Sequence, residues 1–227
     1  MASFLACRDR QINQLRERIV AHEERWNILA KAMGPNYADK DLATWELFGD
    51  ARHRRNQQCV LRALKEFRDT IPAKVAAGVN LIFAGPIGTG KDFMMADTLR
   101  CAVKTYGKFA RWRNGIEIFS EYRATMNPKS TVTEPEFIKK LTEIQILAIS
   151  DLLPPAGNLT EFQAGLMFDV IDTRYRQGLP TWLTLNVEDP DEAKRRLGSQ
   201  IVDRLFHRPA VMFCDWPSYR EHEGRKA

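Results

Sequence analysis

A glycine-rich turn has the spacing that holds phosphate groups. Residues 85–91 read G-P-I-G-T-G-K, which fits G-x-x-x-x-G-K, between an apolar run and a helical pattern. In such a loop the backbone N–H groups surround the phosphates, and the lysine adds positive charge. A glycine turn of purely structural use is the alternative. The predicted phosphate-binding residues are Gly85, Pro86, Gly88, Thr89, Gly90, Lys91 and Asp92.

The residue after the lysine departs from the usual pattern. A Ser or Thr that binds Mg²⁺ is expected there, and this chain has Asp92. After a later apolar strand, Ser150 stands where a metal-organising Asp is expected, and Asp151 where a water-polarising Glu is expected. Compared with the usual pattern, the hydroxyl and the carboxylate have thus exchanged positions in the sequence. Asp92 and Ser150 are therefore predicted to share one Mg²⁺. The alternative is drift in a site that binds nucleotide but turns it over slowly.

The elements that would position these residues alternate along the chain. Strands are expected at residues 79–84, 109–112, 144–149, 181–185 and 210–213, and helices at 56–69, 91–106, 115–126, 161–177 and 190–206. In the first of these helices, Cys59, Val60, Leu64 and Phe67 are expected to face inward. The alternation predicts an α/β fold with a mainly parallel sheet between helices.

Residues 4–33 form a long helical pattern without glycine or proline. Apolar residues recur along it in a 4-3 alternation, the spacing of a helix–helix seam. The expected organisation is a partner-binding segment at 1–34, a linker at 35–55 and a nucleotide-binding domain at 56–227. Packing of the seam on its own domain is the alternative. The residues predicted to bind a partner are Ile12, Leu15, Ile19 and Trp26.

The composition narrows the class of protein. A net charge of +5 and a pI near 9.1 over 227 residues permit nucleic-acid binding without requiring it. No apolar run approaches the roughly 18–20 residues needed to cross a bilayer, and the first residues lack the apolar region of a signal peptide. We therefore expect a cytoplasmic protein with no membrane contact. The four cysteines form no C-x-x-C pair, which favours reduced thiols over zinc binding.

Further motifs carry a resemblance to a known family. They are "LTLN" at 183–186, G-x-x-x-x-D-R-L at 198–205 and W-x-S-Y-R at 216–220. With the glycine turn, they resemble the DnaC-like helicase loaders, AAA+ ATPases that are close to the IstB transposition ATPases. The resemblance covers residues 42–220. It implies an AAA+ P-loop NTPase core preceded by a helical extension, with ATP and Mg²⁺ as cofactors.

The resemblance implies roles for individual residues. Asn186 matches sensor 1, which contacts the γ-phosphate or the attacking water. Arg204 matches the arginine finger that reaches a neighbouring subunit's site, and Arg220 matches the sensor 2 arginine. With Asp151 these form the predicted catalytic set. Because Ser150 and the short Asp151 depart from the family pattern, weak hydrolysis at most is expected.

The resemblance also implies partners. Such loaders grip a hexameric replicative DNA helicase through the N-terminal extension, self-associate through AAA+ interfaces, and hold single-stranded DNA partly by a helical insertion after the second strand. In this insertion Phe119, Tyr122, Arg123 and Lys129 would combine stacking rings with cations. Core packing of the two rings is the alternative.

The leading function is a helicase loader, and a phage origin fits its compact size. An IstB-like transposition ATPase and a non-catalytic AAA+ adaptor of the helicase are the alternatives.

Overall fold

The computed structural model describes residues 2–224 and the side chains of residues 13–222. Five strands form one sheet in the order β2-β3-β4-β1-β5, and every neighbouring pair is parallel. The expected parallel α/β architecture is therefore confirmed. The strands are β1 (Leu81–Gly85), β2 (Ala110–Asn114), β3 (Ile146–Ser150), β4 (Thr181–Asn186) and β5 (Ala210–Phe213).

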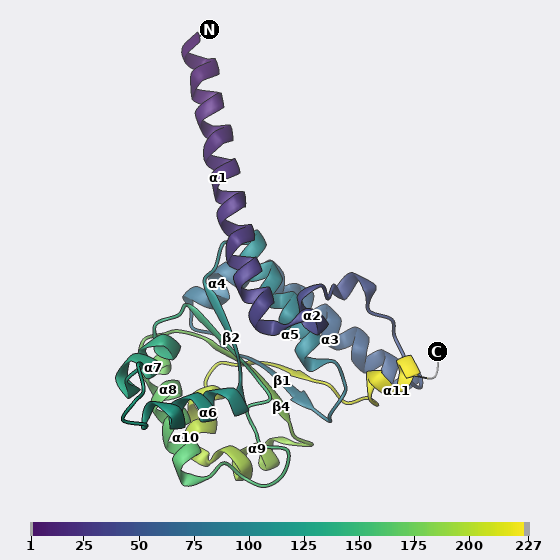
Figure 1. The fold of residues 1–227 in the computed structure, drawn as a ribbon. Coiled ribbons are helices and arrows are strands. Elements are labelled where there is room, and N and C mark those ends of the chain that lie inside the picture. Colours follow the sequence, from purple (N-terminus) through teal and green to yellow (C-terminus); the bar gives the residue numbers. More distant parts are fainter. Residues whose placement is uncertain (1, 225–227) are drawn as a thin grey trace.

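Helices cover both faces of the sheet (Figure 1). One face packs on α1 (Ala2–Met33), α2 (Pro35–Ala38), η1 (Leu42–Thr44), α3 (Ala51–Asp69), α4 (Ile71–Ala76), α5 (Lys91–Arg100) and η2 (Cys101–Thr105). The other packs on α6 (Gly115–Thr125), α7 (Glu134–Thr142), α8 (Glu161–Arg176), α9 (Pro190–Leu197) and α10 (Ser199–Leu205). The last described helix is α11 (Tyr219–Gly224). Each face has its own apolar core, because strands of a parallel sheet bury side chains on both sides.

Three expected helices differ in detail. The helix expected at 190–206 is divided into α9 and α10 by Gly198, whose φ of +91° ends the first helix. The last turn of the helix expected at 91–106 widens into the π-helical η2. Helix α3 begins at Ala51, five residues earlier than expected, because the Asp50 side chain caps it by accepting from the His53 N–H. The inward position expected for Cys59 is wrong, because Cys59 is exposed.

The long N-terminal helix has two parts with different environments, which we call its N-terminal half (residues 2–20) and its C-terminal half (residues 21–33) (Figure 1). In its C-terminal half, Trp26, Leu29 and Met33 are buried in the core of the domain. In its N-terminal half, which projects from the domain, Leu15 and Ile19 are 55% and 61% exposed. The predicted partner contact of Trp26 is therefore wrong, because its ring is already buried. The side chain of Ile12, another predicted contact, lies outside the described residues.

Residues 35–55, expected as a linker, pack against the domain. Phe48 is buried, and Trp45 contacts Phe93, Trp216 and Tyr219 through ring pairs. The N-terminal boundary of the packed domain therefore lies within α1 and not at residue 56. No helix of residues 2–224 is both long enough and apolar enough to cross a membrane.

Candidate nucleotide site

A cavity of about 390 Å³ lies where the carboxyl ends of the strands meet. Strand pairing places Gly85 beside Asn186, and it brings the ends of β3 and β4 together. Residues far apart in the sequence therefore converge here, as is usual for ligand sites of open parallel sheets. The lining residues are Asn36, Tyr37, Lys40, Trp45, Ile87, Gly88, Gly90, Lys91, Asp92, Phe93, Asp151, Asn186, Tyr219 and Arg220.

The glycine turn lies between β1 and α5, as the motif predicts. Gly90 precedes the first residue of α5 with φ +87°, a conformation that favours glycine. The loop is also held by the C-terminal motif W-x-S-Y-R: the Trp216 indole N–H donates to the Thr89 carbonyl at 2.9 Å, and the Tyr219 N–H donates to the Gly88 carbonyl at 2.8 Å. The motif at 216–220 thus shapes the phosphate loop as well as supplying Arg220.

The Lys91 ammonium is buried against the loop that it follows. Its Nζ donates to the carbonyls of Gly85 at 2.8 Å and Pro86 at 2.5 Å. Burial lowers the pKa of Lys91, although nearby Cys214 and the Asp92 and Asp151 carboxylates oppose this shift. Backbone N–H groups of the turn and this ammonium form a donor set that suits phosphate. The residues present therefore fit the triphosphate of ATP.

Two carboxyl groups line the cavity beside the loop. Asp92 Oδ1 accepts from the Thr184 hydroxyl at 2.9 Å, and Asp151 Oδ1 accepts from the Asn186 amide at 2.8 Å. Burial and the Asp151 charge raise the pKa of Asp92 to about 6, while hydrogen bonds from Thr184 and Ser150 oppose the rise. A divalent cation would offset this repulsion, and oxygen ligands are those that Mg²⁺ prefers. The donor set therefore fits Mg²⁺.

The two exchanged positions are close together. Ser150 is buried at the end of β3 and hydrogen-bonds to Asp92 on α5. This proximity is what a shared metal requires, and the shared metal itself stays a prediction.

Asp151 has an unusual backbone. Its φ is +47°, and its N–H donates to Thr184 Oγ1 at 2.9 Å. The left-handed conformation is uncommon outside glycine and is found frequently at functional sites. Thr184 therefore connects Asp92 to the backbone of Asp151. Sequence reasoning missed this residue, although it lies in the quoted "LTLN" two positions before Asn186.

The two predicted arginines lie at different sites. Arg220 lines the nucleotide cavity and hydrogen-bonds to Tyr37. Arg204 lines a separate cavity of about 330 Å³, where its Nε donates to Asp172 Oδ1 at 3.0 Å and its guanidinium lies 5.2 Å from the Tyr175 ring centre. This cavity also includes residues that precede β1 and β4, at the amino end of the sheet. The catalytic roles of both arginines stay predictions.

The predicted stacking of DNA bases on Phe119 and Tyr122 is wrong. These side chains are 6% and 7% exposed and pack in the core against α7 and α8. Helix α6 uses this face to cover the sheet, so both rings are largely occupied by packing within the domain. Arg123 and Lys129 are exposed, and their contact with DNA stays a prediction.

Besides Phe93, four aromatic or basic side chains that sequence reasoning did not assign to the cavity also line it. Tyr37, Lys40 and Trp45 come from the segment taken for a linker, and Tyr219 comes from the C-terminal motif. The signal for Tyr219 was its place inside W-x-S-Y-R. For the other three, no spacing in the sequence connects them with residues 85–92.

Comparison with known proteins places the chain near bacterial replication proteins. No protein-family model matches it. It is 24% identical over 169 residues to the replicative helicase loader DnaC of Buchnera aphidicola subsp. Acyrthosiphon pisum, covering 73% of this chain and 65% of that protein. The corresponding loader of Buchnera aphidicola subsp. Baizongia pistaciae is 24% identical over 172 residues, covering 74% and 66%. The match therefore spans slightly less than two thirds of the length of these relatives.

Solved structures show the same fold. A crystal structure of the DnaC helicase loader superposes with a TM-score of 0.67 at 19% identity, covering 79% of this chain and 99% of that one. The DnaI crystal structure gives 0.61 at 17% identity, covering 82% and 93%. Aquifex aeolicus DnaA bound to AMPPCP gives 0.56 at 16% identity, covering 86% and 55%. The expected AAA+ fold with an N-terminal helix is therefore confirmed, as is the resemblance to DnaC-like loaders.

Proposed function

We propose that this chain, with its AAA+ fold and DnaC-like sequence, is a nucleotide-controlled loader that delivers a hexameric replicative DNA helicase to single-stranded DNA. ATP with Mg²⁺ would occupy the cavity at the carboxyl end of the sheet. The protein would act mainly by binding, with slow hydrolysis.

The observation that carries the proposal is the division of α1 into two halves. Its C-terminal half is fixed to the nucleotide-binding domain by Trp26, Leu29 and Met33. Its N-terminal half leaves Leu15 and Ile19 exposed on one face. A helix with uncovered apolar residues at four-residue spacing can pack against helices of a partner. Because the C-terminal half of α1 is fixed to the domain, a partner bound to the N-terminal half would move together with the domain.

The nucleotide site supports control by ATP. Lys91 and the backbone N–H groups of residues 87–91 would bind the phosphates, and Asp92 with Ser150 would hold Mg²⁺. Asn186 and Arg220 line the same cavity and would contact the terminal phosphate. Slow turnover follows because Asp151, already engaged by Asn186, is shorter than the expected Glu. Misplacing a group that orients water costs on the order of 10²-fold in rate.

Self-association and DNA contact complete the proposal. Arg204 lies outside the cavity that contains Lys91, which supports a role in a neighbouring subunit's site. Arg123 and Lys129 would contribute phosphate contacts to single-stranded DNA, so this binding should weaken as salt rises. Without the rings of Phe119 and Tyr122, the contact would be electrostatic and weakly dependent on base identity.

The test is co-purification of the full chain with the replicative helicase of the cell in which it is found. Leu15→Asp and Ile19→Asp place a charge on the proposed contact face and should reduce helicase binding by tenfold or more, because a buried unpaired charge is costly. Val20→Asp is the matched control: Val20 is also 55% exposed, but it lies roughly 140° around the helix from Leu15.

Equal binding by all three variants would contradict the helicase contact. Removal of residues 1–20 should have the same effect as Leu15→Asp and leave the domain folded, because the buried half of α1 remains. Lys91→Ala separates a loader from a non-catalytic adaptor. An adaptor would retain full activity in helicase loading, whereas a nucleotide-controlled loader would lose it.

A further inference from the structure

The nucleotide cavity has one wall that comes from the segment between α1 and α3. We call residues 34–48 the strap. Tyr37, Lys40 and Trp45 of the strap line the cavity together with the phosphate loop residues. This wall consists mainly of ring surface and differs from the polar wall formed by Lys91 and Asp92.

Trp45 is the centre of the ring wall. Its indole stacks on Tyr219 with 5.5 Å between ring centres, and it meets Phe93 edge-on at 5.4 Å. The indole also lies directly against the loop, because a Cβ on Gly90 would be 2.6 Å from it. Any side chain at residue 90 would therefore displace Trp45. The position of this indole is thus defined relative to the phosphate loop.

A buried glutamine on α3 holds this part of the strap. Gln57 is fully buried, and its Oε1 accepts from the Trp45 indole N–H at 3.2 Å and from the Phe48 N–H at 3.3 Å. Its Nε2 donates to the Phe48 carbonyl at 2.8 Å. One side chain thus satisfies both backbone groups of Phe48 and the indole of Trp45. A buried amide with all these partners fixes geometry, because each unmade hydrogen bond would be costly.

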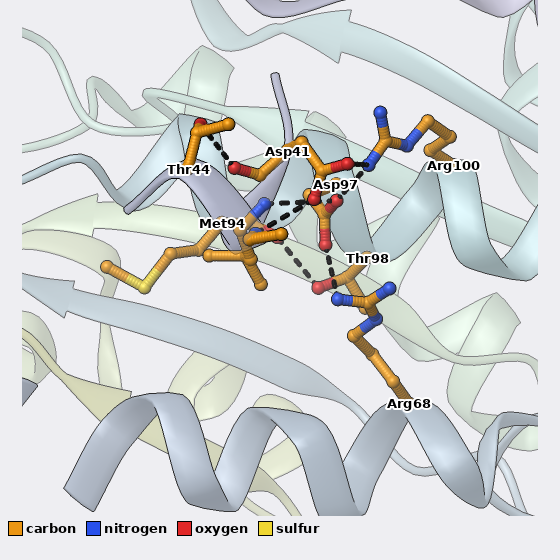
Figure 2. A network of polar contacts seen from close by, with 9 residues as sticks. Asp41, Thr44, Arg68, Met94, Asp97, Thr98 and Arg100 are labelled. Atoms are coloured by element: carbon orange, nitrogen blue, oxygen red, sulfur yellow. Dashed lines mark hydrogen bonds and ion pairs between the residues drawn. The ribbon is translucent and has the colours of Figure 1, made fainter. Parts of the chain in front are cut away.

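A second buried side chain anchors the strap upstream (Figure 2). Asp97 on α5 is fully buried, forms ion pairs with Arg68 at 2.7 Å and Arg100 at 2.6 Å, and accepts from the Leu42 N–H at 3.4 Å. Asp41 of the strap adds a contact with Arg100 at 3.1 Å. The strap is therefore held at two points between α3 and α5.

We propose that Gln57 is a positioning residue that holds Trp45 as a stacking surface for the aromatic base of a nucleotide. This inference rests on the proposed nucleotide binding at the phosphate loop. The phosphates are assigned to the Lys91 side, so the base must lie toward the remaining wall of the cavity. A flat aromatic ring is the part of a nucleotide that gains most from ring surfaces, and stacking on aromatic side chains tolerates different bases.

The test compares ATP with inorganic tripolyphosphate, which has the phosphates but no base. Binding of each to the full chain is measured by calorimetry in the presence of Mg²⁺. Trp45→Ala and Gln57→Met should each weaken ATP binding roughly tenfold, and they should leave tripolyphosphate binding within about twofold. Gln58→Met is the matched control, because this neighbouring glutamine is exposed and should change neither.

The double variant distinguishes positioning from a general structural effect. If Gln57 acts only through Trp45, adding Gln57→Met to Trp45→Ala should cause no further loss of ATP affinity. Equal losses for ATP and tripolyphosphate, or unchanged ATP binding in both single variants, would overturn the inference. If Gln57→Met does not fold, Trp45→Ala alone still decides whether the base uses this wall, because Trp45 is partly exposed.

The outcomes also separate this inference from the proposed function. Lys91→Ala should weaken both ligands, because it removes the phosphate contact. A wild-type chain that binds ATP no better than tripolyphosphate would retain the phosphate site and contradict the base-stacking wall. A wild-type chain that binds neither ligand would overturn both.

Discussion

Buried charged side chains have opposite environments at the two ends of the parallel sheet. At the carboxyl end, burial and the Asp151 charge raise the pKa of Asp92 to about 6, and Asp151 has φ +47°. At the amino end, the buried guanidinium of Arg174 donates to the carbonyls of Leu141 at 2.9 Å and Ile144 at 2.8 Å, and its Nε donates to Thr181 Oγ1 at 3.1 Å. It also donates to the Pro180 carbonyl.

The difference separates a structural charge from a site built for a ligand. Arg174 joins the end of α7 to the starts of β3 and β4, and its hydrogen bonds are complete within the domain. The carboxyl end instead concentrates like charges and an uncommon backbone conformation, features that cluster where function requires them. Substitutions at the amino end should therefore change stability most, whereas those at the carboxyl end should change ligand binding most.

The largest expected effect is on stability at the amino end. Arg174→Met removes the donors to several buried carbonyls and should lower the free energy of unfolding by roughly 3 kcal/mol or more. Arg176→Met on the same helix is the control. Arg176 is exposed and pairs only with Asp172 among the acidic side chains that the structure describes, so its loss should cost at most about 1 kcal/mol. Urea unfolding of both variants measures the difference, and equal effects would contradict the assignment.

Lys91→Ala should have the converse result at the carboxyl end. Loss of the charged contacts with phosphate should weaken ATP binding by roughly 10–100-fold, and loss of the donor to the Gly85 and Pro86 carbonyls should lower the free energy of unfolding by less than Arg174→Met does, because fewer carbonyls lose their donor. Calorimetry with ATP and Mg²⁺ measures the affinity, and the exposed Lys139→Ala is the control. A variant that loses stability but keeps its ATP affinity would mean that Lys91 is structural in the same way as Arg174.

The exchanged pair should behave as a coupled unit. Asp92→Thr alone leaves two hydroxyls near the metal, and Ser150→Asp alone puts two carboxylates beside a polyanionic ligand. The double variant restores one hydroxyl and one carboxylate. Mg²⁺-dependent ATP affinity and turnover of the four proteins should therefore give an interaction energy of roughly 0.5–3 kcal/mol. Additive effects would show that Asp92 and Ser150 do not share a metal.

The smallest expected effect is a pH dependence of stability without nucleotide. The pKa of Asp92 in the folded chain, about 6, is above its usual value of 3.8, so between these pH values the folded chain binds more protons than the unfolded chain. Asp92 therefore lowers stability as the pH rises toward 6, and its full cost is present above that pH.

Asp92→Asn should remove this cost. It should raise the Tm at pH 8 by about 2–4 °C, and the gain should shrink as the pH falls below about 6. Thermal unfolding from pH 5 to pH 8 measures it. A gain that is the same at every pH would show that the Asp92 carboxyl is not perturbed in the folded chain.

The sequence by itself determined the parts of the protein that depend on local pattern. Apolar strands, helical spacing and G-x-x-x-x-G-K predicted the parallel sheet and the phosphate loop, because these features depend on residues close together in the chain. Asp151 was found for a similar reason, and Asn186 through the motif that carries the family resemblance. Each stands at the end of an apolar strand, and parallel strands bring such ends to one edge of the sheet.

Only the tertiary structure decided which apolar and aromatic residues are exposed and which are buried in the domain. Trp26 and Ile19 share one helical seam in the sequence, yet one is buried and the other is 61% exposed, because α1 extends beyond the domain it packs on. Periodicity defines a face of a helix but not what covers it. Gln57 joins the nucleotide cavity through Trp45 for the same reason: the contact depends on how α3 packs against the strap, and local spacing in the chain does not encode that packing.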